Sequence, residues 1–355
     1  MKTSSSILTF SFGHFLTDFS CGWLLCSMNA AGQLELTDAA RIILLFNLLA
    51  FGTQFLFGLA ADRFALNGRF FAAGGCAAVA AALAVGGHSP VAAVLLAGLG
   101  SAAFHVGGGI DAVTREAGFT RAGIFVSTGV PGIALGAHFG EEQKIPVFFL
   151  IGLLIFTALA AVSLCTGTRR ETQNLSYRED DDDASAPVFS SVGMAVTLLL
   201  GAILIRAWAG FLAPNAGSES RFAFAIPAAA AFAGMFLGGV LADLFGARKV
   251  GTLAVLISIP LFFAGAEHFL VFAAAIFFFN AAMPVTLVEL VRRLKGREGL
   301  AFGLTELAAL CGYLGSTLLP LSDRPAKFAV VFLALIAAAD IYLTASDRGE
   351  GLLKK

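Results

Sequence analysis

The sequence predicts an all-α integral membrane protein with twelve transmembrane helices in two six-helix bundles. Of its 355 residues, 58% are hydrophobic and only 13% are Asp, Glu, Lys or Arg, about half the roughly 25% charged residues of soluble domains. The mean hydropathy is +0.85, and apolar runs recur along the whole chain. A water-soluble fold of this length needs a polar exterior that this composition does not supply, which excludes a large soluble domain.

The apolar runs are each about 20 residues long, which is enough to cross the roughly 30 Å hydrocarbon layer. The first run follows a short start without a cleavage site, so we expect a retained helix and no signal peptide. Alternating segments of about 10 residues, typical of membrane β-barrels, are absent. The twelve runs are 6–29, 40–61, 69–87, 90–111, 120–139, 146–167, 187–213, 221–243, 249–266, 268–290, 298–320 and 326–345.

The basic residues orient these helices. With the N-terminus inside and the loops on alternate sides, most Lys and Arg residues fall on the inner side. The positive-inside rule therefore predicts a multi-pass protein of the cytoplasmic (inner) membrane with both termini in the cytoplasm. The net charge of −1 indicates no nucleic-acid partner. We expect a monomer in the lipid bilayer without a cofactor, and we interpret the five cysteines as packing residues because none forms a C-x-x-C pair.

The chain divides into two related halves. The polar segment GTRRETQNLSYREDDDDAS separates six runs from six, which predicts a bundle at 1–167, a linker at 168–186 and a bundle at 187–355. We interpret the linker as a solvated tether, although its acidic run also has the chemistry to bind a cation. FGTQFLFGLAAD (51–62) aligns without gaps to FAGMFLGGVLAD (232–243), and both end on Asp. Duplicated bundles are typical of secondary transporters that bind substrate between the halves.

Four motifs give the chain a resemblance to a known family. GLAADRFALNGR (58–69) and GVLADLFGARK (239–249) resemble the G-x-L-A-D-R-x-G-R-K loop of the major facilitator superfamily. HFLTDF (14–19) and GLGSAAFHVGGG (98–109) resemble its fosmidomycin-resistance-type branch. GIFVSTGVPGIALG (123–136) resembles its Gly-Pro antiporter motif. The resemblance implies the major facilitator fold and a secondary transporter that exports its substrate.

The two loops hold the predicted gating residues. A carboxylate at Asp62 can accept from the free N–H groups at the start of a neighbouring helix and pair with a nearby arginine. The resemblance implies that such contacts hold the cytoplasmic side closed; the alternative is that these charges only fix the topology. The candidates are Gly58, Asp62, Arg63, Arg69 and Arg115 in the first half, and Gly239, Asp243, Arg248 and Lys249 in the second, with Arg292 as a further partner for Asp243.

Two titratable residues inside the first helix form the predicted coupling site. At 1.5 Å per residue Asp18 lies roughly 15–18 Å into its helix, near the membrane midplane, and His14 lies on the same face one turn earlier. Histidine titrates near neutrality, so we expect the His14–Asp18 pair to bind the coupling proton, with Glu306 as the alternate. The resemblance implies that the first and fourth helices line one cavity, which makes His105 a further candidate. A purely structural pair is the first alternative, and a transition-metal site is the second because imidazole and carboxylate both ligate such ions.

The second half offers different candidates. Arg206 is expected either to bind an anionic substrate or to extend its guanidinium to the outer headgroups. Asn280 lies beside an expected kink at Pro284. Glu306 is the second-half candidate for proton or cation binding. Asp340 is expected to be structural, and Glu289 is expected to need no special role.

These residues predict a proton-coupled secondary transporter that exports a small organic solute. The sequence has no GxxxxGK[ST], GxSxG or HExxH motif, so we expect neither ATP hydrolysis nor another enzymatic activity. Three alternatives remain open. They are a proton-coupled uptake symporter, a transition-metal carrier that uses His14, Asp18 and His105, and a receptor that does not transport.

Overall fold

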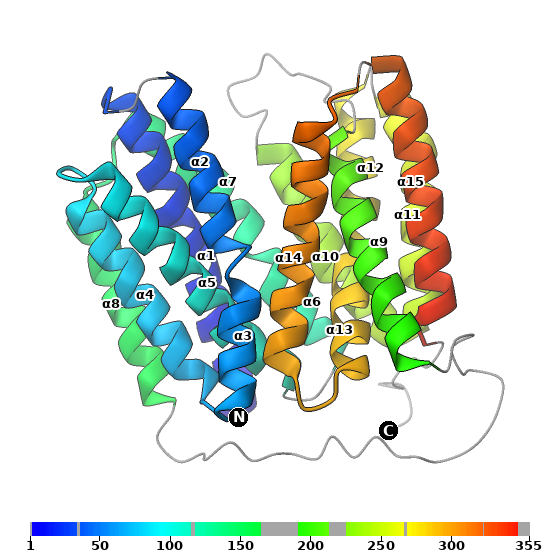
Figure 1. Cartoon of the computed structure of the whole chain (residues 1–355), viewed down its shortest axis with the longest axis horizontal. Helices are drawn as coiled ribbons and strands as arrows, with labels where there is room; N and C mark the ends of the chain where they lie inside the picture. Colours follow the sequence, from blue (N-terminus) through cyan, green and yellow to red (C-terminus); the bar gives the residue numbers. More distant parts are fainter. Residues whose placement is uncertain are drawn as a thin grey trace. The chain divides into compact units, whose positions relative to one another are not determined.

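The computed structural model describes residues 2–33, 36–114, 118–164, 191–212, 225–265, 268–321 and 323–346, and every regular element in these ranges is a helix (Figure 1). The predicted linker and Arg115 lie outside the described residues. The helices are α1 Lys2–Ala30, α2 Leu36–Ala50, α3 Gln54–Arg63, α4 Gly68–Val85, α5 Pro90–Thr114, α6 Phe119–Ser127, α7 Gly129–Glu142, α8 Val147–Ser163, α9 Val192–Leu212, α10 Ala225–Phe245, α11 Ala247–Gly265, α12 Phe269–Ala281, α13 Met283–Arg293, α14 Glu298–Leu318 and α15 Asp323–Thr344.

Each of the twelve predicted apolar runs coincides with one helix or with two consecutive helices, so the predicted all-α membrane fold is confirmed. Among the described residues, 10 helical segments are long and apolar enough to cross a membrane. The helix α8 is apolar but shorter, and α1 carries polar residues in its interior. Three crossings are interrupted, between α2 and α3, between α6 and α7, and between α12 and α13, where Pro284 stands at the expected break.

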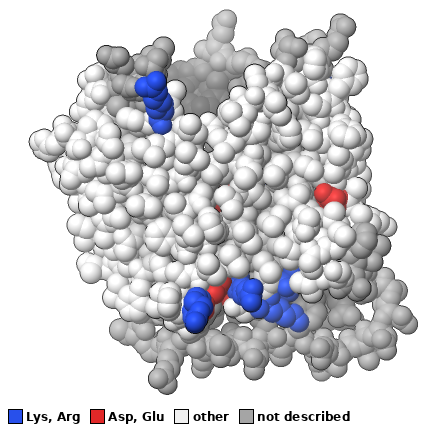
Figure 2. All heavy atoms as spheres, in the orientation of Figure 1, with Lys and Arg blue, Asp and Glu red and all other residues white. Residues whose placement is uncertain are grey.

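The outward-facing side chains fit a lipid environment. Large hydrophobic residues are widely exposed, among them Phe148 at 74%, Leu270 at 73% and Phe328 at 68%. Figure 2 shows that the middle of one face is almost entirely uncharged and that Lys and Arg gather near the helix ends. Exposed apolar patches of this extent are rare on soluble monomers, and the bilayer supplies their solvent.

The helices divide into two compact units. The first comprises Met1–Arg115, Thr128–Arg169 and Arg297–Leu307, and the second comprises Glu116–Ser127, Arg170–Gly296 and Ala308–Lys355. Most helices of each sequence half therefore stay together, but α6 belongs to the second unit and the beginning of α14 belongs to the first. The division into 1–167, 168–186 and 187–355 stays a prediction.

A glycine stripe on α7 brings that helix against α1 in the first unit. Gly132, Gly136 and Gly140 recur every four residues and face the backbones of Phe15, Phe19 and Trp23. A Cβ at any of the three glycines would collide with those backbone atoms. Small residues at this spacing permit close approach of membrane helices. The contact fixes the register of α1, which carries His14 and Asp18, against α7.

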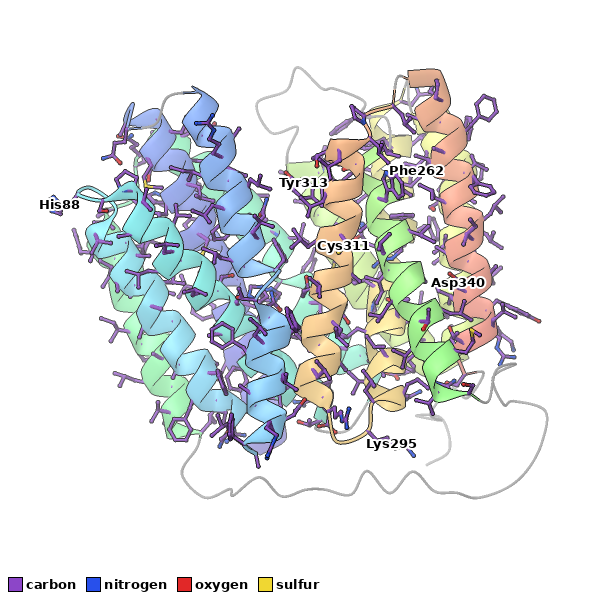
Figure 3. All side chains as sticks on the ribbon, viewed as in Figure 1. His88, Phe262, Lys295, Cys311, Tyr313 and Asp340 are labelled. Carbon is purple, nitrogen blue, oxygen red and sulfur yellow. The ribbon has the colours of Figure 1, made fainter. Side chains whose placement is uncertain are left out.

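The second unit uses the same device on α10. Gly234 and Gly238 face the backbones of Phe277 and Ala281 on α12. Beside this contact, Phe262, Phe272 and Phe279 form a buried aromatic cluster between α11 and α12. The side chain of Phe262 is labelled in Figure 3.

Candidate functional site

Three titratable side chains from α1 and α5 meet in the interior of the first unit. Asp18 Oδ2 lies 3.3 Å from His14 Nε2, and Asp18 Oδ1 lies 3.4 Å from His105 Nε2. The two imidazoles contact each other edge to face, with centroids 4.5 Å apart. His14 is 5% and His105 7% exposed. The structure thus brings His105 to the His14–Asp18 pair, a contact that the sequence left open; we call the three residues the His14–Asp18–His105 cluster.

The orientation of His105 follows from its own helix. Its Nδ1 lies 2.7 Å from the carbonyl oxygen of Ser101, one turn earlier on α5. A carbonyl oxygen can only accept, so Nδ1 carries the proton and Nε2 faces Asp18. A second proton on Nε2 makes the contact with Asp18 an ion pair. A metal-ligating histidine also holds its outer nitrogen this way, so the donor set suits a transition-metal ion as well.

Glycine residues make room for the cluster. Gly129 begins α7 opposite His14 and Asp18, and a Cβ there would lie 2.5 Å from Asp18 Oδ2 and closer still to His14 Nε2. Gly13 lies against the ring of Phe104, where a Cβ would approach to 2.7 Å. The cluster is therefore enclosed by backbone on the α7 side. Sequence reasoning missed Gly129, although it belongs to the Gly-Pro stretch at 123–136.

Glu306 approaches the cluster from α14. This residue is 9% exposed and lies in the segment Arg297–Leu307, which belongs to the first unit. Its carboxylate interacts electrostatically with His105. The residue predicted as the second-half proton candidate is thus part of the surroundings of the first-half cluster.

Arg206 and Asn280 belong to the second unit and have partners there. Arg206 is 8% exposed, and its guanidinium carbon lies 5.7 Å from the centre of the Phe279 ring. The Asn280 side chain donates to the carbonyl oxygen of Ile276 at 2.9 Å, one turn earlier. Burial of Arg206 beside an aromatic ring favours a site inside the unit over an extension to the headgroups.

Asp62 accepts from the start of α14. Its carboxylate receives the backbone N–H groups of Gly299 at 3.2 Å and Leu300 at 2.7 Å. Gly58, one turn earlier on α3, lies so close to Gly299 that a Cβ would collide with its carbonyl group. The predicted acceptor role of Asp62 towards a neighbouring helix start is therefore observed.

Asp243 repeats this arrangement in the second unit, at the start of α6. It accepts from the backbone N–H groups of Phe119 at 2.9 Å and Thr120 at 2.7 Å, and from the Thr120 hydroxyl. Gly239 lies against the Phe119 carbonyl, with no room for a Cβ. The duplication that the sequence predicts thus extends to hydrogen bonds.

Arg69, Arg63 and Arg248 make contacts that the sequence did not predict. Arg69 pairs with Asp111 on α5, with 3.2 Å between Nη2 and Oδ1, and donates to the carbonyl oxygen of Leu164 at the end of α8. The guanidinium carbon of Arg63 lies 6.0 Å from the centre of the Phe64 ring.

In the second unit, Arg248 donates to the carbonyl oxygen of Ala345 at 3.0 Å, at the end of α15. Lys249, on the first turn of α11, remains a gating candidate from the sequence alone. Arg69 and Arg248 therefore each bind the end of the last helix of their own half.

Two acidic residues are buried in these networks: Asp111, which the sequence analysis did not single out, and Glu289. Asp111 pairs with Arg69 as described. Glu289 on α13 is 2% exposed and accepts from the Ser346 backbone N–H, the Ser346 hydroxyl and Arg292. The expectation that Glu289 needs no special role does not fit this position. Asp111 lies near the end of α5 in the first half, and Glu289 lies near the end of α13, the corresponding helix of the second half. This symmetry was the sequence signal that could have identified them.

Asp340 lies where α15 packs on α9 (Figure 3). It is 9% exposed, and a Cβ on Gly201 of α9 would lie 3.6 Å from its Oδ2. Its helix is remote in sequence from the cluster, and its structural role stays a prediction.

Comparison with solved structures identifies the fold. A bacterial homologue of the iron transporter ferroportin matches with a TM-score of 0.60 and 16% identity over 96% of this chain and 97% of that chain. The E. coli fucose:proton symporter FucP matches with a TM-score of 0.65 and 14% identity over 97% and 98%. The human organic anion transporter MFSD10 matches with a TM-score of 0.64 and 14% identity over 96% and 99%.

FucP is described as a major facilitator superfamily transporter, so this chain has the fold for which the sequence resemblance was noted. At these identities the likeness concerns the fold alone. No protein-family model and no curated protein matches the chain. The three proteins named above are each described as transporters.

Proposed function

We propose that the protein is a secondary active transporter that moves a small organic solute across the cytoplasmic membrane by alternating access, coupled to protons bound at the His14–Asp18–His105 cluster. The observation that carries the proposal is the position of the Asp18 carboxylate between two imidazoles in the interior of a membrane helix. Ionisable groups at such depth are expensive to bury and mark ion or substrate pathways. Histidine exchanges its proton near neutral pH.

The surroundings of the cluster support proton exchange. Glu306 is the further carboxylate that acts on it. Cys21, one turn from Asp18 on α1, and Cys76 on α4 are the neighbouring thiols, and thiols are ordinarily neutral at pH 7. His14, Asp18, His105 and Glu306 are therefore the candidates to hold the exchanged protons.

The two aspartate contacts supply gates in this proposal. A helix start released by Asp62 or Asp243 leaves unpaired N–H groups. The contacts therefore favour the conformation in which α14 and α6 lie against α3 and α10. Loss of both sets of bonds accompanies the change to the opposite state.

The solute and the direction rest on resemblance. FucP carries fucose with protons and MFSD10 carries organic anions, which supports a small organic solute. The Gly-Pro stretch and the HFLTDF motif support export. In this proposal the protein is a monomer, and both of its termini lie in the cytoplasm. Arg206 is the candidate for an anionic group of the solute.

The test uses proteoliposomes that contain a pH-sensitive dye. Sugars, organic anions, amphipathic drugs and divalent metals are added as probes at two pH values. We expect one organic probe to move protons and to accumulate under an imposed pH gradient. Asp18→Asn and His105→Ala should abolish both effects, whereas His138→Ala, a histidine on α7 outside the cluster, should not.

The alternatives give different results in the same assay. Proton flux in the direction of solute entry identifies an uptake symporter. Flux of a metal ion that requires His105 identifies a metal carrier. Ligand binding without any counterflow identifies a receptor. Transport that ignores the gradient while Asp18→Asn stays fully active overturns proton coupling.

A further inference from the structure

The chain passes from one compact unit to the other at two points inside helical crossings. In the fifth crossing, the second unit ends at Ser127 and the first resumes at Thr128, between α6 and α7. In α14, the first unit ends at Leu307 and the second resumes at Ala308. Both crossings therefore have one end in each unit.

Both transfer points adjoin the His14–Asp18–His105 cluster. Gly129, the first residue of α7, lies against His14 and Asp18 with no room for a Cβ. Glu306, two residues before Ala308, acts electrostatically on His105. The first is a steric contact with backbone, and the second is an electrostatic interaction. A change in the shape or charge of the cluster thus acts on each crossing at the point where it changes unit.

Aspartate side chains bind the first residues of α6 and of α14, the helices that contain or adjoin the two transfer points. The α6 segment begins at Phe119 and Thr120, whose N–H groups bind Asp243. The α14 segment begins near Gly299 and Leu300, whose N–H groups bind Asp62. The α14 segment thus carries Glu306 near one end and the residues that bind Asp62 at the other. The helix α6 is joined through Thr128 to Gly129 and carries at its start the residues that bind Asp243. A helix moves as a unit because, apart from its ends, its backbone N–H and C=O groups bond to one another within the helix.

We propose that Gly129 and Glu306 are positioning residues that transmit the state of the cluster along two separate routes, through α6 to Asp243 and through α14 to Asp62. Loss of the Asp18 charge frees His14 to move against Gly129 and weakens the fixed position of His105 opposite Glu306. The first change shifts α6, and the second shifts α14. The inference rests on the proposed function for its purpose, but its test requires no transport.

The test is hydrogen–deuterium exchange of the purified full chain at one constant pH. Asp18→Asn serves as the neutral form of the cluster, which avoids the pH dependence of intrinsic exchange. The readouts are the amides of Phe119 and Thr120 and those of Gly299 and Leu300. We expect Asp18→Asn to speed exchange at both pairs about threefold or more, because local opening governs exchange.

The two routes separate in double variants. In a Gly129→Ala background the response to Asp18→Asn should disappear at Phe119 and Thr120 and persist at Gly299 and Leu300. In a Glu306→Gln background the pattern should reverse. Gly152→Ala on α8, where a Cβ meets nothing within 4 Å, and Glu141→Gln, an exposed carboxylate on α7, are the matched controls and should leave both responses intact.

Several results would overturn the inference. One is unchanged exchange at both amide pairs in Asp18→Asn. Another is a response at Phe119 and Thr120 that survives in the Gly129→Ala background, or one at Gly299 and Leu300 that survives in the Glu306→Gln background. If Gly129→Ala does not give a monodisperse protein, the Glu306→Gln arm decides alone. Separate responses in a protein that ignores a pH gradient would retain the two routes and reject proton coupling, so the two failures can be told apart.

Discussion

Asp62 on α3 accepts a 2.7 Å hydrogen bond from the backbone N–H of Leu300 on α14, although 238 positions separate them in the sequence. Asp243 forms a bond of the same length with Thr120, 123 positions away. A carboxylate at a helix start satisfies donors that no intrahelical acceptor reaches and complements the helix dipole. The two bonds thus anchor α14 and α6 by one physical mechanism.

Asp62→Asn is expected to lower the transport rate about tenfold or more while the protein stays folded. Asparagine retains one acceptor oxygen but loses the charge, and hydrogen bonds to charged groups contribute about 1.5–3 kcal/mol each. Initial rates in proteoliposomes and the gel-filtration profile measure the two effects. Asp243→Asn should behave alike, with Glu141→Gln as the control. Full activity in both aspartate variants would contradict the gating role.

Asp111→Asn is expected to destabilise the first unit. The variant leaves Arg69 buried without its carboxylate, and breaking one partner of a buried ion pair costs about 3–5 kcal/mol. The apparent melting temperature in detergent should fall clearly. Lys144→Gln removes the exposed partner, at 66% exposure, of an ion pair with Glu142, and surface pairs contribute only about 0–1 kcal/mol. Equal melting temperatures for the two variants would refute this account of Asp111.

Gly136→Val is expected to separate α7 from α1. The backbone of Phe19 occupies the space that a side chain at this position needs, so the helices must move apart and the contacts on both sides of the stripe are lost. Gel filtration of the detergent extract should show little monodisperse protein. Gly152→Val, on the open face of α8, should give a normal yield. A normal profile for Gly136→Val would mean that the α1–α7 contact is dispensable.

Arg206→Gln tests whether this buried cation binds solute. If it does, the apparent affinity for an anionic probe should fall about tenfold or more, with little change in melting temperature. Arg206→Lys keeps the charge but loses the planar contact with Phe279, so it should recover part of the affinity. A large loss of thermal stability with unchanged affinity would assign Arg206 to packing.

The fold was predictable because length and hydropathy fix membrane crossings almost independently of tertiary contacts. Every predicted apolar run became a helix or a pair of helices. The break before α13 followed from Pro284. The break between α6 and α7, just before Gly129, could not be predicted in this way. The residues of α1 that surround Gly129 lie far away in the sequence.

The candidate site was predictable in part. Spacing alone places His14 and Asp18 on one helix face, but nothing in the sequence links them to His105. That link depends on how α5 packs against α1. The same reason explains the partners of Arg69. Its neighbour in the folded chain is Asp111 on another helix, and sequence proximity had favoured Asp62.

The helix α6 belongs to the second unit and the start of α14 to the first, and this arrangement has a consequence for biosynthesis. The ribosome makes the chain from its N-terminus, so residues 1–164 emerge well before Arg297–Leu307 is synthesised. The first unit lacks one of its own segments throughout that interval, and the N–H groups that satisfy Asp62 do not yet exist. The nascent protein must therefore carry an incomplete N-terminal bundle in the bilayer until the eleventh crossing inserts.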